Sequence, residues 1–201
     1  MINKIPNLAV FDFDGTITNV DTFNDIILLN FGRIKFYLFC FLISPIIFLY
    51  KLSILKNDVP KKILFKYFFG GMNVSKFKKI CDHYQIRLAM QVKKDALVKI
   101  KYHQSKNDTV IINSASIFNW IYPWASNHKI HHILATEIEI KNNVVTGNFS
   151  TPCCYGAEKV NRLLHKFSSI KFDKIYAYGD SRGDKQLLKF SDFPNYKAFK
   201  G

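Results

Sequence analysis

Three short apolar runs, widely separated along the chain, each end in a polar turn and are each followed by a helical pattern. They lie at Leu8–Phe13, within Asp108–Ser116 and within Asp173–Ser181. Strands that are apolar on both faces are typical of a parallel sheet covered by helices on both sides. We therefore expect an α/β fold with a doubly wound, Rossmann-like parallel sheet, whose ligand site lies beyond the carboxyl ends of these strands.

A long, largely helical segment separates the first two runs. Asp58–Gly71 has a candidate N-cap in Asp58, a proline in the first turn and a Gly-Gly stop. Ser75–Met90 places apolar residues at helical spacing, and Asp95–Tyr102 begins the helix that leads back to the core. The sequence thus predicts a helical cap at residues 21–98, inserted into an α/β core formed by residues 1–20 and 99–201.

The second half of the chain contains further local signals. Ala135–Phe149 alternates in polarity and turns at Asn142-Asn143, which predicts a β-hairpin. Glu158–Phe167 has the pattern of a helix, and Trp120 and Trp124, four residues apart, are expected on one packed helix face.

Six polar residues follow or flank the predicted strands: Asp12, Asp14, Ser114, Lys159, Asp180 and Asp184. Asp12 and Asp180 suit a hard divalent cation, because Mg²⁺ takes oxygen ligands and usually keeps waters beside one or two carboxylates. Lys159 and the Ser114 hydroxyl suit phosphoryl oxygens, and Asp14 suits acid–base chemistry beside a nucleophilic Asp12. This set indicates phosphoryl transfer through an aspartyl-phosphate.

Four segments carry a family resemblance: "DFDGT", "IINSAS", "YGAEKVNRL" and "YGDSRGD", in that order. With them the chain resembles the haloacid dehalogenase (HAD) superfamily, in the subgroup (subfamily IB) that is similar to phosphoserine phosphatase and has a helical cap after the first motif. The resemblance covers essentially the whole chain and implies a Mg²⁺-dependent phosphomonoester hydrolase.

The resemblance also implies a role for each matching residue. Asp12 is the nucleophile, and Asp14 protonates the leaving oxygen and later activates water. Ser114 and Lys159 bind the phosphoryl group, together with Gly15 and Thr16 of the first motif. Asp12, the main-chain carbonyl of Asp14, and Asp180 hold Mg²⁺, and Asp184 supports the metal or Lys159. An aspartate at position 14 favours a phosphatase over the dehalogenases, which lack that acid.

Asp21 lies nine residues after Asp12, where the resembling phosphoserine phosphatases carry a glutamate that meets the substrate amino group. A substrate contact and an N-cap for a helix starting near Thr22 are both open for this residue. The other candidate site residues also have purely structural alternatives. Asp12 and Asp14 can belong to a turn, Ser114 can be a helix N-cap, and Lys159 can be a solvated helix residue.

Phe36–Tyr50 contains fifteen residues without a charge, between Lys35 and Lys51, and is interrupted by Pro45. A single crossing is not expected, because a spanning helix needs about 20 apolar residues. A buried helix pair and an interfacial or re-entrant element are the two alternatives for this stretch.

Residues 22–98 carry 13 lysines and arginines against four acids, within a chain of net charge +14. We expect this cap to contact an anionic inner leaflet and the substrate to be a small or lipid-linked phosphate.

Rival functions use the same features differently. Phosphoserine phosphatase proper is one alternative, and phosphotransfer to an acceptor other than water is another. A basic nucleic-acid-binding or membrane-binding protein on a degenerate HAD core would rest on charge alone, and no nucleic-acid-binding motif is present. We expect no nucleic-acid partner and infer no obligate protein partner.

The compartment is predicted from the thiols and the N-terminus. Cys40, Cys81, Cys153 and Cys154 include no C-x-x-C pair, which favours reduced thiols in a cytoplasmic protein. Asp12 lies so near the start that a cleavable signal peptide would not fit before it. We therefore expect a cytoplasmic protein, peripheral at the inner leaflet if the cap contacts membrane.

Overall fold

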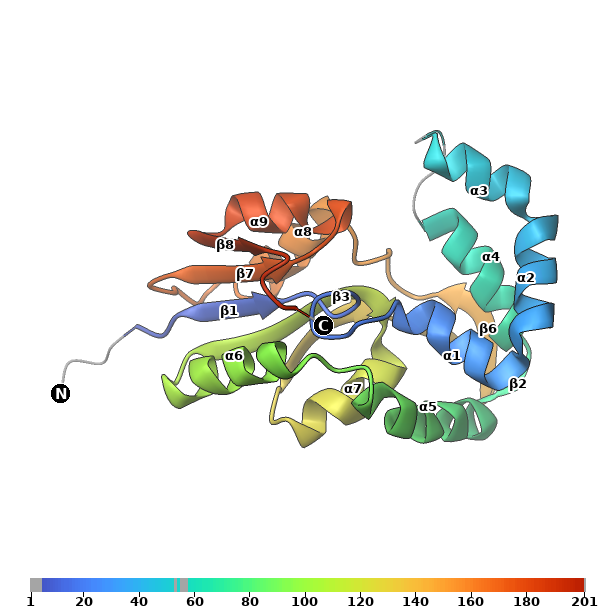
Figure 1. Ribbon diagram of the computed structural model, residues 1–201, viewed down its shortest axis with the longest axis horizontal. Helices are drawn as coiled ribbons and strands as arrows, with labels where there is room; N and C mark the ends of the chain where they lie inside the picture. Colours follow the sequence, from blue (N-terminus) through green and yellow to red (C-terminus); the bar gives the residue numbers. More distant parts are fainter. Residues whose placement is uncertain (1–4, 53, 55–57, 201) are drawn as a thin grey trace.

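A five-stranded parallel sheet forms the centre of the fold in the computed structural model, which describes residues 5–52, 54 and 58–200 (Figure 1). Its strand order is β4-β3-β1-β7-β8, and every neighbouring pair is parallel. The strands are β1 (Leu8–Phe11), β3 (Thr109–Ile117), β4 (His132–Thr136), β7 (Ile175–Gly179) and β8 (Phe193–Tyr196). The predicted α/β class with a parallel sheet is therefore confirmed.

Helices cover both faces of this sheet because alternate residues of the central strand are buried on opposite sides. Leu8 and Val10 of β1 belong to a cluster with residues of α8 (Ala157–Lys166) and α9 (Lys185–Phe190). Ala9 and Phe11 belong to the larger cluster that includes α6 (Lys94–Ser105) and α7 (Phe118–Asn127). A strand buried on both faces must be apolar throughout, which explains the continuous apolar runs in the sequence.

The strand order determines where a ligand can bind. From β1 the chain continues to β3 and β4 on one side, and it then returns to β7 and β8 on the other side of β1. The carboxyl ends of β3, β1 and β7 are therefore neighbours at the point where the strand order reverses. In open α/β sheets the crevice at this point is where ligands bind.

Most of the chain between β1 and β3 is helical, as predicted: α1 (Thr22–Phe31), α2 (Arg33–Leu42), α3 (Ser44–Lys51), α4 (Asp58–Phe69), β2 (Met72–Asn73), α5 (Val74–Ala89) and α6. In Figure 1, α1 to α5 lie to the right of the sheet, beyond the carboxyl end of β1. The predicted helices at 58–71, 75–90 and 95–102 correspond to α4, α5 and α6. Asp58 is the first residue of α4, and the three residues before it lie outside the described part of the chain.

The predicted hairpin is present as β5 (Ile138–Lys141) and β6 (Val144–Phe149). Asn142 and Asn143 have φ of 48° and 61°, the left-handed conformation that a two-residue hairpin turn requires. β6 also pairs with β2, so the hairpin and the inserted segment share a three-stranded antiparallel sheet. The sequence does not indicate this pairing. The division into residues 1–20 and 99–201 against 21–98 stays a prediction.

Two further features concern side chains. Trp120 and Trp124 are both buried on α7, which confirms one packed helix face. Of the four cysteine thiols, those of Cys81, Cys153 and Cys154 are buried, and that of Cys40 is partly buried.

The uncharged stretch predicted from Phe36 to Tyr50 forms α2 and α3, which meet at an angle of 68°. None of the described helices is long and apolar enough to cross a membrane by itself, whereas these two together, as a bent pair, have the length and apolar composition of a span. Only Phe36 and Ile43 of residues 36–50 are buried. The alternative of a buried helix pair is therefore wrong, because α2 and α3 pack against the protein along one side only.

Candidate active site

Asp12 follows β1 directly, and its carboxylate is buried at the carboxyl end of the sheet. Its Oδ1 atom accepts a hydrogen bond of 2.5 Å from Lys159 Nζ, in the first turn of α8. Lys159 Nζ also donates to Asp184 Oδ1 at 2.6 Å, and the lysine side chain is only 2% exposed. A buried ammonium between two carboxylates is held in one position, because it would otherwise be desolvated without compensation.

The first motif turns sharply toward Asp180 after Asp12. Gly15 has φ of +75°, and a Cβ atom there would lie 2.3 Å from Asp180 Oδ2. The position therefore requires glycine both for its left-handed backbone and for the close approach of the carboxylate. The Thr16 hydroxyl, one residue on, donates to Asp180 Oδ1 at 3.2 Å. The Gly-Thr pair thus brings the end of β1 against the end of β7.

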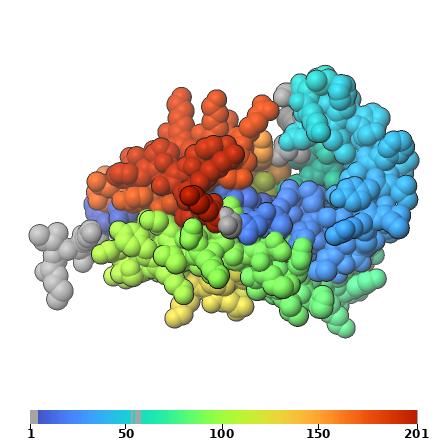
Figure 2. Space-filling view, viewed as in Figure 1, coloured from blue at the N-terminus to red at the C-terminus, as the bar shows by residue number. Residues whose placement is uncertain are grey.

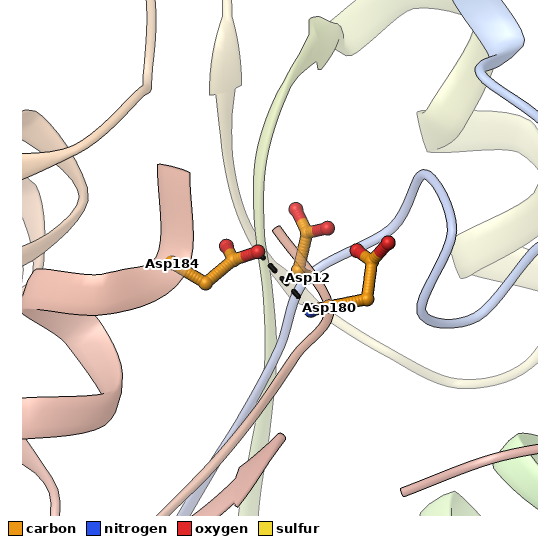
Figure 3. A group of neighbouring side chains, drawn as sticks. All are labelled: Asp12, Asp180 and Asp184. Carbon is orange, nitrogen blue, oxygen red and sulfur yellow. Dashed lines mark hydrogen bonds between the residues drawn. The ribbon is translucent and has the colours of Figure 1, made fainter. Parts of the chain in front are cut away.

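Three carboxylates form a cluster at this edge: Asp12, Asp180 and Asp184 each offer an oxygen, and these atoms lie within 4.8 Å of one another (Figure 3). Asp184 is already engaged, since its Oδ2 accepts from the backbone N–H groups of Asp180 and Ser181 and from the Ser181 hydroxyl. Asp12 and Asp180 accept fewer hydrogen bonds than Asp184 does, so their carboxylate oxygens are freer to bind a cation. An all-oxygen set with room for water fits the preference of Mg²⁺.

The Asp14 carboxylate is held by the N-terminus of α1, away from this cluster. Its Oδ1 accepts from the Thr22 hydroxyl at 2.6 Å and from the Thr22 backbone N–H at 3.1 Å. The Thr22 hydroxyl is in turn within 2.8 Å of the Ser116 hydroxyl and accepts from the Trp120 indole N–H at 3.2 Å. A helix N-terminus favours an ionised carboxylate through its free N–H groups and its dipole.

Burial changes the protonation of both aspartates of the first motif. It raises the pKa of Asp12 to about 7, although Lys159 opposes this. Burial likewise raises the pKa of Asp14 to about 6, with a further rise from Asp21 and an opposing effect of Lys61 on α4. Burial by itself would lower the pKa of Lys159, but the charges of Asp12 and Asp184 outweigh it and raise that pKa. Lys159 is thus cationic, and Asp14 has a pKa suited to proton transfer near neutral pH.

Ser114 lies within β3 and not after it, at the irregular part of the ladder where the register to β4 shifts. It is buried, and its hydroxyl oxygen accepts from the backbone N–H of Ser116. Asp21 is exposed, and its carboxylate caps α1 by accepting from the Asn24 backbone N–H at 3.0 Å. The N-cap reading of Asp21 is confirmed, and a substrate contact stays a prediction.

A cavity of about 700 Å³ connects these residues. At one end it is lined by Asp12, Asp14, Ser114, Lys159 and Asp180, and Asp21 also faces it. A second group of lining residues is mainly apolar and comes from α2, α3 and α4: Phe36, Cys40, Ile47, Tyr50, Pro60 and Leu64. The cavity therefore has a charged end at the sheet and an apolar wall made by the inserted helices.

The model of the haloacid dehalogenase-like hydrolase family matches residues 9–189. The chain belongs to this family. Protein CicA of Caulobacter vibrioides is 24% identical over 199 residues, which cover 98% of this chain and 88% of that protein. The family membership confirms the resemblance drawn from the four motifs.

Two solved structures have the same fold as this family member. A protein with unknown function from Bordetella pertussis Tohama I matches with a TM-score of 0.81 at 17% identity, covering 94% of this chain and 88% of that one. A substrate-bound phosphoserine phosphatase complex matches with a TM-score of 0.67 at 16% identity, covering 93% and 83%. At these identities the likeness shows the fold alone.

Some residues that the sequence analysis missed are part of this site. Thr22 binds Asp14, Lys61 Nζ donates to the backbone carbonyl of Ala115 at 3.2 Å, and Lys93 Nζ donates to the carbonyl of Gly15 at 2.7 Å. Thr22 had a usable signal, because it stands in the first turn of a predicted helix that follows an acidic motif. Lys61, on α4, and Lys93, just before α6, had none, since a lysine side chain is usually solvated.

Proposed function

We propose that this family member is a Mg²⁺-dependent phosphomonoester hydrolase that works through an aspartyl-phosphate on Asp12. The arrangement of Lys159 supports this most strongly. Its buried ammonium touches Asp12 and Asp184 in a cavity that Asp14 and Asp180 also line. A fixed cation beside a carboxylate nucleophile offsets the repulsion between that carboxylate and a phosphate dianion.

Asp12 and Asp180, with the main-chain carbonyl of Asp14, are the proposed holders of Mg²⁺, and Asp184 supports Lys159. The all-oxygen character of the carboxylate cluster is what favours this ion. When bound, Mg²⁺ neutralises charge on the phosphoryl oxygens of the substrate.

The chemistry proceeds in two displacements. In the first, a carboxylate oxygen of Asp12 bonds to phosphorus, the bond from phosphorus to the ester oxygen breaks, and Asp14 donates its proton to that leaving oxygen. In the second, water attacks the phosphorus of the aspartyl-phosphate while Asp14 takes a proton from it, and Asp12 leaves with release of inorganic phosphate. A raised pKa lets Asp14 serve as acid and then as base near neutral pH.

The apolar wall of the cavity favours a phosphate monoester whose alcohol part is apolar, such as a lipid-linked phosphate. Phe36, Ile47 and Leu64 line the cavity together with Asp12, so the leaving group of a bound monoester can contact side chains that offer no hydrogen bond to a sugar or an ammonium. Phosphoserine is the second candidate, favoured by the exposed Asp21 carboxylate at the cavity and by the fold shared with a phosphoserine phosphatase.

Phosphate release from a long-chain alkyl phosphate, phosphoserine and a sugar phosphate tests this proposal, with Mg²⁺ or with excess chelator. Activity should require Mg²⁺, should be lost in Asp12→Asn, and should be unchanged in the matched control Asp173→Asn, an exposed carboxylate outside the cavity. Asp14→Asn should block turnover and leave radiolabelled phosphate on the protein. Adding an alcohol acceptor separates hydrolysis from phosphotransfer.

Full activity of Asp12→Asn would refute the nucleophile. Salt-dependent oligonucleotide binding with no phosphate release from any monoester would favour the nucleic-acid alternative instead.

A further inference from the structure

The helices α2 and α3 expose an unusual amount of apolar surface. We call residues 33–52 the arm. Ile34 is 80% exposed and Phe41 76%, on a segment whose other exposed large apolar residues are Tyr37, Leu38, Leu42, Phe48, Leu49 and Leu52. Eight such side chains within twenty consecutive residues form a patch of the kind that marks an interaction site, and not the scattered apolar residues of an ordinary surface.

The inner side of α2 packs on α4, which anchors the arm and leaves its other face free. Phe39 stacks on Tyr67 of α4 with ring centroids 3.7 Å apart, and it meets Phe68 at 5.9 Å. Phe36 also packs on Phe68, at 6.3 Å. These contacts hold one side of α2 against α4. An arm anchored in this way can place its outer face in an interface, but it cannot cross a bilayer without breaking the aromatic cluster.

The charges of the arm select the kind of partner. Arg33, Lys35 and Lys51 stand at its two ends and are exposed, and residues 33–52 contain no aspartate or glutamate. An apolar face bordered by cations complements an anionic lipid surface. A second copy of the arm is disfavoured, because two such faces would bring like charges together.

The position of the arm relates this face to the cavity. The sides of α2 and α3 that are turned inward carry Phe36, Cys40, Ile47 and Tyr50, which line the cavity containing Asp12. In Figure 2 the cyan part of the arm stands apart from the orange and red C-terminal part, with an indentation between them. A surface that contacts the outer face of α3 would therefore lie beside the wall of the cavity.

We propose that the arm docks this protein on an anionic lipid bilayer, with α2 and α3 lying in the interface and their outer face among the lipid headgroups. The docking needs neither a bound metal nor a substrate, and so it goes beyond the proposed hydrolase activity. It combines burial of the exposed apolar side chains with attraction of the flanking cations to the anionic headgroups.

Sedimentation of the full chain with vesicles tests the docking, using phosphatidylglycerol–phosphatidylcholine and pure phosphatidylcholine vesicles at low and high salt. We expect binding to the anionic vesicles that weakens as salt rises. Phe41→Ser should reduce the partition coefficient roughly tenfold, because burial of a phenylalanine ring contributes at least that factor. Lys51→Gln should reduce binding at low salt and have little effect at high salt.

Ile86→Ser on α5 is the matched control, because Ile86 is 67% exposed but lies outside the arm. It should bind as the unchanged protein does. All variants should keep the same helical content and thermal midpoint as the unchanged protein. Absence of vesicle binding, or equal binding by Phe41→Ser and the unchanged protein, would overturn the proposal. A protein that has no affinity for lipid but forms a dimer, which Phe41→Ser dissociates, would also overturn the proposal. In that case a second copy of the chain, and not a bilayer, would cover the arm.

Discussion

Replacing Asp12 by asparagine is expected to stabilise the metal-free protein while abolishing hydrolysis. The folded protein buries the Asp12 carboxylate in a cluster with Asp180 and Asp184, and Lys159 is the cation that touches it. Burial raises its pKa from 3.8 to about 7. Because the folded pKa lies above the unfolded one, this group costs stability, and the cost grows as the pH rises from about 4 through about 7.

The magnitude follows from the pKa. A tenfold change in an equilibrium constant corresponds to about 1.4 kcal/mol, so the ionised Asp12 costs about 4 kcal/mol at pH 8 and about 2 kcal/mol at pH 5. The pKa of about 7 already includes the attraction of Lys159, so an uncharged asparagine, which resembles the protonated acid, removes the whole cost. The expected gain is therefore about 4 kcal/mol at pH 8 and about 2 kcal/mol at pH 5. For a chain of this size, 2 kcal/mol raises Tm by about 4–8 °C.

Urea and thermal unfolding of both proteins in excess chelator, at pH 8 and pH 5, measure this difference. Mg²⁺ should then stabilise the unchanged protein more than the asparagine variant, because the variant lacks a proposed ligand. A variant that is less stable than the unchanged protein at pH 8, or a gain that is the same at both pH values, would refute the reasoning about the buried carboxylate.

Three further changes test the surroundings of Asp14 and α1. Thr22→Val removes the hydroxyl that binds Asp14 Oδ1, so kcat should fall about 10-fold or more with little change in KM, whereas Thr22→Ser should retain most activity. Lys61→Met removes a charge that lowers the pKa of Asp14, so the limb of the kcat/KM profile that reports this group should move to higher pH. Asp21→Ala should cost about 1 kcal/mol of unfolding free energy by removing the N-cap of α1, and Asp21→Asn should cost almost nothing. A rise in KM for phosphoserine in Asp21→Asn would assign a substrate contact to that carboxylate.

The fold class and the gathering of the motifs could be predicted because their signals are local. The residues of β1 are apolar without alternation, which already requires a sheet covered on both faces, and Asn142-Asn143 between alternating segments already requires a hairpin. Asp12 and Asp180 follow strands of one parallel sheet directly, so topology alone brings them to the same edge.

The sequence by itself determined the periodicity of the elements, the turns between them and the kinds of side chain at the carboxyl edge of the sheet. It left open which long-range partner each polar group takes. Lys159 lies 147 residues from Asp12, and nothing local distinguishes it from a solvated helix lysine until α8 packs against β1 and buries it. Thr22 binds Asp14 only because α1 enters at the end of β1, and the hairpin joins the inserted helices only because β2 is free to pair with β6.

The arm shows the same limit. Its composition is compatible with a buried pair and with an exposed one, and the tertiary structure decided between them. α4 offers Tyr67 and Phe68 to one side of α2, and no other described element covers the opposite side. Burial depends on which surfaces remain once the whole chain has packed, and that is a property of the assembled fold that no local pattern contains.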